Sequence, residues 1–222
     1  MTRRTLWIAL LLIAAPAVAQ MGPPGGRPGG SPQPPTGMVP PLGRDFVFEV
    51  GAWAEYTMSQ GQMAMTVKYS VVGKENCDKA TCYWLETEMK MPGGAMMHRV
   101  LLSGDPNDPA NVKKMFVKPP GGAAIEVPVG GAKLGGTGSG TVGPPSGGAA
   151  KPPPPKFSEQ GSTKMSISGK ALDCKHLRAT FRGMTMDAWV SKGVKLFGLV
   201  KLEAPMMTLV LKDFGTGAKT GF

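Results

Sequence analysis

Three methionine pairs of the form Met-x-Met are the residues of this sequence best suited to chemistry by type and spacing. The chain has 222 residues and 16 methionines, and the pairs are Met63/Met65, Met89/Met91 and Met184/Met186. Residues two apart in a β-strand point to the same side, so each pair would present two thioethers together. Methionine is flexible and polarizable and is common on adaptable apolar binding surfaces. We therefore expect these six residues to form a binding face for an apolar, lipid-like or acyl ligand.

Two other interpretations of the methionines stay open. Thioethers are soft ligands that select Cu(I), so the Met-x-Met pairs, with His98 joining them, would suit a periplasmic copper-handling protein. Alternatively, the methionines only pack in the core, on the side of each strand opposite its polar residues. The protein would then be a structural or envelope-interaction protein with no small-molecule ligand.

Motifs for catalysis are missing from the sequence. His98 and His176 are its two histidines, and we expect both to be solvated at the surface. Neither H-E-x-x-H nor G-x-S-x-G occurs. The carboxylates Glu86, Glu88 and Asp187 fall on polar strand faces, where solvation explains them. The sequence therefore favours a protein that is not an enzyme and that holds neither a metal nor a cofactor.

The three cysteines suggest one local disulfide. Cys77 and Cys82 are close enough to pair across the turn between them in an oxidising compartment. In the chain-entropy model, so short a loop stabilises the fold by only about 2 kcal/mol. Cys174 is left over, either as a small buried hydrophobe or as a free thiol.

The beginning of the chain has the features of an export signal. Arg3 and Arg4 precede an apolar core, and a small-residue cleavage site ends at Ala19. Residues 1–19 are thus predicted to be a signal peptide, which leaves a periplasmic or extracellular protein. Outside this segment, no apolar run approaches the roughly 18 residues that a membrane-spanning helix needs.

Two segments rich in glycine and proline divide the rest of the chain. Residues 20–43 are predicted to be a disordered linker, and residues 119–155 a disordered insertion, because such compositions bury little apolar surface. Between and after them, residues 44–222 are expected to form one interrupted β domain. Two separate domains are less favoured, because each half alone would be small.

Apolar and polar residues alternate with period two in both folded segments, which predicts β-strands. A first predicted strand begins at residues 51–56, and the further predicted strands lie at 62–72, 83–91, 164–168, 176–182, 183–191, 195–203 and 208–214. Short strands separated by turn residues favour a mostly antiparallel sheet. We expect a mostly β protein with few or no helices, built as one curved antiparallel sheet or an open half-barrel. The one helical segment considered is a turn or two near Asn111–Met115.

The formal net charge of +10 is spread along the chain. Lys192, Lys195 and Lys201 near Trp189 form the densest group and would suit contact with anionic groups of the cell envelope. An export signal and the lack of a pattern of stacking aromatic residues disfavour nucleic-acid binding.

Two motifs carry a resemblance to known proteins. Gly51, Trp53, Glu55 and Tyr56 begin the first predicted strand, and an apolar segment runs from Trp189 to Glu203. With the export signal, these features resemble exported bacterial β proteins of the outer-membrane lipoprotein-sorting carrier type. The resemblance implies a half-barrel antiparallel sheet over an apolar cavity that accepts acyl chains.

Overall fold

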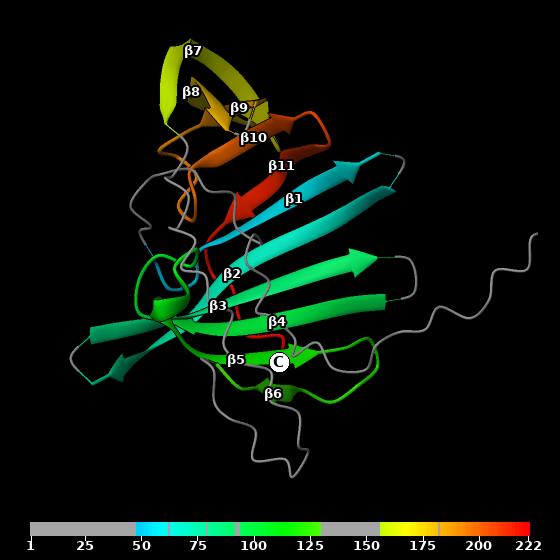
Figure 1. Cartoon of the computed structure of the whole chain (residues 1–222), viewed down its shortest axis with the longest axis vertical. Helices are drawn as coiled ribbons and strands as arrows, with labels where there is room; N and C mark the ends of the chain where they lie inside the picture. Colours follow the sequence, from blue (N-terminus) through cyan, green and yellow to red (C-terminus); the bar gives the residue numbers. More distant parts are fainter. Residues whose placement is uncertain (1–47, 62, 79, 92–93, 130–155, 182) are drawn as a thin grey trace, which may run out of the picture. The chain divides into compact units, whose positions relative to one another are not determined.

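The computed structural model (Figure 1) describes residues 48–61, 63–78, 80–91, 94–129, 156–181 and 183–222. The predicted signal peptide at 1–19, the predicted linker at 20–43 and residues 130–155 of the predicted insertion lie outside this part of the chain. Within the described ranges, no helix is long and apolar enough to cross a membrane.

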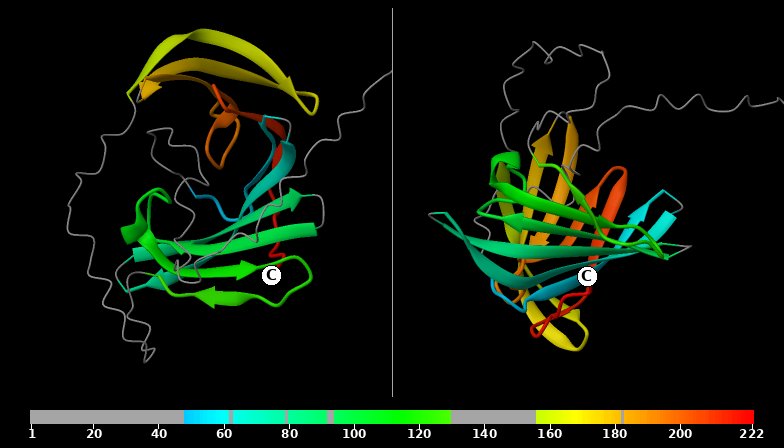
Figure 2. Two further views of the ribbon diagram at one scale, coloured as in Figure 1. Left: turned by 45° about the vertical axis from the view of Figure 1, so that its right-hand side comes forward. Right: turned by 90° about the horizontal axis from the view of Figure 1, so that it is seen from below.

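The described residues form eleven β-strands and one short 3-10 turn. They are β1 (Trp53–Gln60), β2 (Met63–Cys77), β3 (Ala80–Met91), β4 (Gly94–Leu102), η1 (Pro109–Asn111), β5 (Val112–Lys118), β6 (Ile125–Val127), β7 (Phe157–Ile167), β8 (Lys170–Phe181), β9 (Met184–Val190), β10 (Leu199–Ala204) and β11 (Met207–Gly215). The strands make one sheet in the order β6-β5-β4-β3-β2-β1-β11-β10-β9-β8-β7 (Figures 1 and 2). The predicted fold class, a mostly β protein with a single open antiparallel sheet, is confirmed.

Two meanders of consecutive strands join at the centre of this sheet. Strands β1 to β6 and strands β7 to β11 each pair with their neighbours in sequence, and β1 pairs with β11 to unite them. The β1–β11 register runs from Trp53 opposite Gly215 to Ser59 opposite Thr208, with an irregularity between Glu55 and Tyr56. Both halves of the described chain therefore share one sheet.

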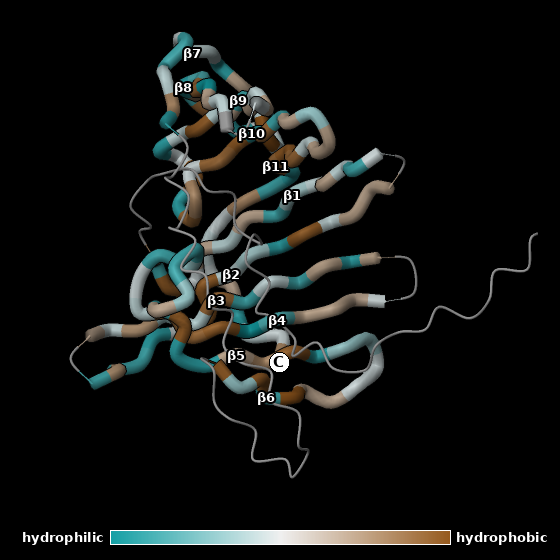
Figure 3. The backbone as a smooth tube through the Cα atoms, viewed as in Figure 1, coloured by the Kyte–Doolittle hydropathy of each residue, from teal (hydrophilic) through white to brown (hydrophobic). Residues whose placement is uncertain are grey.

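Hydrophilic and hydrophobic residues alternate along the strands (Figure 3). This alternation gives the sheet a buried face, here called the core face, which carries Tyr56 and Tyr69. The Tyr69 ring makes edge-to-face contacts with two other aromatic rings. Its centroid is 5.9 Å from that of Tyr56 and 5.0 Å from that of Phe197. The Tyr56 hydroxyl donates to the Leu199 carbonyl at 3.1 Å. This hydrogen bond satisfies the buried Tyr56 hydroxyl within the aromatic cluster.

Residues 191–198, between β9 and β10, form a loop that packs into this core (Figure 2). Val194, Leu196 and Phe197 are buried in it. Gly198 has φ +66°, a conformation that favours glycine, and a Cβ there would lie 3.3 Å from the Ser191 carbonyl oxygen. The predicted strand 195–203 is therefore wrong over its first half, because a continuous apolar run does not distinguish a strand from a buried loop.

Two further local predictions differ from the structure. A helix near Asn111–Met115 is wrong, because only η1 forms there and Val112 already begins β5. The Asp108 side chain caps this single turn by accepting from the Ala110 backbone N–H at 3.1 Å. In addition, Ile125–Val127, inside the predicted insertion, pairs with β5 as strand β6.

Candidate functional site

One end of the sheet gathers four of its turns. In an antiparallel order, the β1–β2, β3–β4, β8–β9 and β10–β11 connections all fall at the same end, while the 191–198 loop lies at the opposite end. Figure 1 shows the last residues of β1 and β3 and the first residues of β2 and β4 at the same end of the sheet. Core-face residues close to these four turns therefore share one region.

Methionines fill this region, which we call the methionine end of the core face. Cross-strand pairs place Met58 opposite Met65 and Met89 opposite Met96, and opposite residues of an antiparallel pair share a face. The complete set is Met58, Met63, Met65, Met89, Met91, Met96, Met184, Met186 and Met207. The topology thus brings all six methionines predicted as a binding face to one end of one face.

Exposure rises along each strand toward the turn. On β2, Val67 is buried, Met65 is half-buried and Met63 is 65% exposed. On β9, the same step leads from buried Ala188 through Met186 to Met184, which is 46% exposed. At the opposite end of the sheet, Val194, Leu196 and Phe197 of the 191–198 loop are buried in the core.

The six predicted methionines differ in burial. Met65 and Met89 are half-buried and pack against the core, and Met186 is half-buried. Met63, Met91 and Met184 are exposed at the hairpin ends. The face begins as core and ends as an apolar surface open to solvent.

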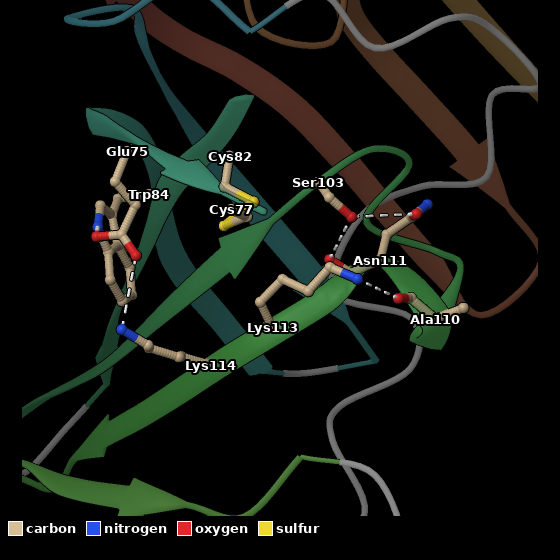
Figure 4. The surroundings of a disulfide bond; sticks show 9 residues. All are labelled: Glu75, Cys77, Cys82, Trp84, Ser103, Ala110, Asn111, Lys113 and Lys114. Atoms are coloured by element: carbon tan, nitrogen blue, oxygen red, sulfur yellow. Dashed lines mark hydrogen bonds and ion pairs between the residues drawn. A yellow bond between two sulfur atoms is a disulfide. The ribbon is translucent and has the colours of Figure 1, made fainter. Parts of the chain in front are cut away.

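Figure 4 shows the disulfide of the β2–β3 hairpin. It lies at the opposite end of these two strands from Met63 and Met91. Cys77 and Cys82 are bonded, with 5.8 Å between their Cα atoms. Nearby, the Trp84 indole N–H donates to Glu75 at 3.1 Å, and Lys114 lies 3.6 Å from the same carboxylate. These contacts brace the β2–β3 hairpin end; they do not form a binding site.

Cys174 is free and buried, with its Sγ 3.6 Å from the Leu172 carbonyl oxygen. Burial raises the pKa of its thiol, and the nearby Asp173 charge raises it further. Of the two states that the sequence left open, the structure shows a thiol that is both unpaired and buried.

His98 is buried on the core face, although the sequence predicted a surface position for it. It lies on β4 opposite Thr87 of β3 and Val117 of β5, and it is only 7% exposed. Neither ring nitrogen has a hydrogen-bond partner among the described residues. Burial lowers the pKa of His98, which favours the neutral imidazole. The expectation of a solvated surface histidine is wrong here.

His176 of β8 lies, in contrast to His98, in a group of polar and aromatic side chains that interact between β8 and β9. Its ring stacks on Trp189 with centroids 4.6 Å apart, and its Nε2 is 2.6 Å from Asp187 Oδ1. Arg178 donates to both oxygens of the same carboxylate, at 2.9 and 3.2 Å. The hydrogen bonds from Arg178 are the largest cause of a lowered pKa of Asp187; they outweigh desolvation, which raises this pKa, and the hydrogen bond of His176 lowers it further.

The three lysines expected to form a charged group are divided by the fold. Lys201 lies 2.7 Å from Glu203 and 4.9 Å above the Trp189 ring. Lys195 pairs with Glu49 at 3.5 Å, and Lys192 is exposed. Because two of the three lysines are paired with carboxylates, the charge they offer to an anionic surface is reduced.

A cavity of about 890 Å³ opens where β7 and β8 meet the 191–198 loop. Its wall combines the apolar side chains of Leu172, Cys174 and Val190 with the cationic ones of Lys164 and Lys175. None of the six predicted methionines lines it. Since Val190 and Met184 are at opposite ends of β9, the cavity and the methionine end are separate places.

The class of protein that the described residues define is an open antiparallel β-sheet of eleven strands. The chain matches no protein-family profile, and no curated protein is significantly similar to it. Among solved structures, it resembles MucB, crystallised in complex with MucA(peri), with a TM-score of 0.41 and 8% identity over 77% of this chain. The chain spans about half the length of that protein, 52%.

Two other solved structures are similar in the same way. A Bacteroides fragilis protein described as exported, with a YmcC-like fold, has a TM-score of 0.36 and 9% identity over 78% of this chain and 100% of its own. A DUF1329 family protein from Desulfovibrio piger has a TM-score of 0.30 and 14% identity over 77% and 86%. These similarities concern the fold alone.

Proposed function

We propose that this chain is an exported, non-catalytic binding protein for an apolar ligand of the lipid or acyl class. The ligand would lie on the methionine end of the core face. The single observation that carries the proposal is the gradient of exposure there, in which apolar side chains continue the core into solvent. On soluble proteins, a large exposed apolar patch marks a site that binds a ligand, a membrane or another protein.

The chemistry of the side chains supports a ligand of variable shape. A thioether side chain has three rotatable bonds and adapts to irregular apolar surfaces. Met58, Met65 and Met207 pack against the rigid core at one end, while Met63 and Met184 are exposed at the other. An acyl chain laid along this strip would cover surface that is otherwise in water, a gain of roughly 25 cal/mol per Å² of apolar area.

A lipophilic fluorescent probe tests the proposal. Purified protein is expected to enhance the fluorescence of the probe, and the double variant Met65→Glu/Met186→Glu is expected to abolish the enhancement. The matched control is Thr66→Glu/Thr185→Glu, which adds the same two charges at the neighbouring positions of the same strands, where side chains point to the opposite face. This control is expected to retain binding.

Three outcomes would contradict the proposal. Wild-type protein that leaves the probe fluorescence unchanged would favour a structural or envelope-interaction protein. Equal loss in both double variants would mean that added charge, and not the methionine face, abolishes binding. Enhancement that survives Met65→Glu/Met186→Glu would place the ligand elsewhere, with the cavity at Cys174 as the next site to test.

A further inference from the structure

A buried histidine and two methionines on adjacent strands form a distinct cluster on the core face. His98 and Met96 are two residues apart on β4, so their side chains leave the strand on the same side. Met89 of β3 lies directly opposite Met96. His98 lies opposite Thr87, two residues before Met89, so His98 and Met89 are diagonal neighbours.

The spacing of a pleated sheet allows these three side chains to converge. Directly opposite residues have Cβ atoms about 4.5–5.5 Å apart, and diagonal neighbours are within about 7–8 Å. Methionine extends over three rotatable bonds, so both sulfur atoms can reach the imidazole from these positions. No backbone movement is needed, because all three residues are on paired strands.

The state of His98 points to a missing partner. Its side chain is more than nine-tenths buried, and both Nδ1 and Nε2 lack hydrogen bonds within the described part of the chain. A buried polar atom is nearly always satisfied by protein, water or an ion. The neighbours of His98 across the strands are Thr87 and Val117, and neither is charged. An ion or molecule that binds next to His98 must therefore interact with a neutral imidazole nitrogen in apolar surroundings.

The donor set selects the class of occupant. Two thioethers and one imidazole are soft to borderline ligands, which favour Cu(I), whereas carboxylate-bound metals need oxygen donors. No group of three His, Cys, Asp or Glu side chains able to hold a metal exists among the residues described. We infer that Met89, Met96 and His98 bind one Cu(I) ion on the core face. This site joins methionines across two strands, in contrast to the Met-x-Met pairs along one strand.

An anaerobic titration of the full chain with Cu(I), in the presence of a chromophoric competing chelator, tests this inference. The wild type is expected to remove one Cu(I) per chain from the chelator. Met89→Leu and Met96→Leu, which keep the side-chain volume and remove the sulfur, are each expected to weaken binding by about tenfold or more. The matched control is Met97→Leu, because Met97 is on the same strand but faces the chain end at Gly221. It is expected to bind like the wild type.

Methionine methyl NMR provides a readout that does not depend on affinity or on copper redox chemistry. Ag(I), a redox-inert soft ion, is expected to shift the methyl signals of Met89 and Met96 and the ring signals of His98, and to leave Met97 unchanged. Zn²⁺ is expected to shift none of them, because protein zinc sites use three or four thiolate, imidazole or carboxylate ligands, and this cluster offers one imidazole alone. These residues differ from Met65 and Met186 of the probe experiment, so the two proposals can fail separately.

Several results would overturn the copper site. Wild-type protein that takes no Cu(I) from the chelator would do so. Undiminished binding in Met89→Leu and Met96→Leu would also do so, since it would assign the copper to other methionines. An equal loss in Met97→Leu, or Zn²⁺ shifts at His98, would show that the response is not specific to this thioether–imidazole set.

Discussion

Glu86 accepts a hydrogen bond from the Gly221 backbone N–H at 2.9 Å, although 135 residues separate the two in sequence. Thr220 donates its hydroxyl to the other oxygen of the same carboxylate at 2.5 Å, and Arg99 lies 3.7 Å away. The last residues of the chain thus cross the polar side of β3 and leave Glu86 only 4% exposed. A carboxylate that the strand pattern assigns to solvent is buried by this segment.

Glu86→Gln tests how much these contacts stabilise the fold. Hydrogen bonds to a charged group contribute roughly 1.5–3 kcal/mol, so we expect the free energy of unfolding to fall by about that amount in urea denaturation. The control is Glu88→Gln on the same face of the same strand, where the carboxylate is partly exposed and 3.8 Å from Lys90. Its loss is expected to stay below about 1 kcal/mol. Equal losses in the two variants would show that the chain end does not stabilise Glu86.

Asp187 gives the protein a predictable response to acid. Hydrogen bonds from Arg178 lower its folded pKa below the unfolded value of about 3.9. A depressed carboxyl pKa stabilises the fold above the unfolded pKa, and this contribution is lost as the pH falls through the folded pKa. The difference in unfolding free energy between wild type and Asp187→Asn is therefore expected to be largest near neutral pH and to shrink below about pH 4.

Urea denaturation at a series of pH values measures this difference. The control introduces Asp187→Asn into an Arg178→Met background, which removes the largest cause of the pKa shift. In the Arg178→Met background, the change in unfolding free energy caused by Asp187→Asn should depend much less on pH in the acid range. A wild-type difference that grows as the pH falls would contradict the assignment, because it would mean that the folded pKa is raised.

Some parts of the fold could be predicted from the sequence because they depend on local alternation. Strand β2 is an example, since Met65 and Val67 face the core while Thr66 and Lys68 alternate with them. Burial of Glu86 depends on a segment 135 residues away, which no local pattern contains. The buried position of His98 had a usable signal, because Met96, His98, Val100 and Leu102 repeat with period two along β4.

The methionines also have one property that follows from local sequence and one that depends on distant parts of the chain. Their shared side follows from spacing, as for Met63 and Met65. Their exposure does not, because it is decided by what covers the face. The 191–198 loop covers one end and leaves the other open, and its apolar run resembles a strand in sequence. The spacing of the methionines therefore predicts a shared side of the strand but does not predict burial.

Cys174 is expected to be inert toward thiol reagents in the native protein. Its side chain is buried and its pKa is raised, and only the thiolate is a nucleophile. Labelling of the native chain should be slower than that of the unfolded chain by roughly two orders of magnitude, because it requires opening of the structure. In denaturant, one thiol per chain should react without reductant, since Cys77 and Cys82 are bonded. Rapid labelling of the native protein would contradict the burial of Cys174.

Phe197 allows the role of the 191–198 loop to be measured directly. Its ring is buried at 5.0 Å from the Tyr69 ring centroid, so it joins the loop to the core face of β2. Phe197→Ala removes a large buried side chain and is expected to cost about 3–5 kcal/mol of unfolding free energy. Phe197→Leu keeps most of the apolar volume and should cost clearly less unfolding free energy.

If the loop closes its end of the core face, Phe197→Ala should also raise lipophilic-probe fluorescence in the folded protein, by exposing apolar surface next to Tyr69. A loss of about 1 kcal/mol or less in Phe197→Ala, with unchanged probe fluorescence, would show that the loop only rests on the sheet. The gradient of exposure toward the methionines would then need another cause.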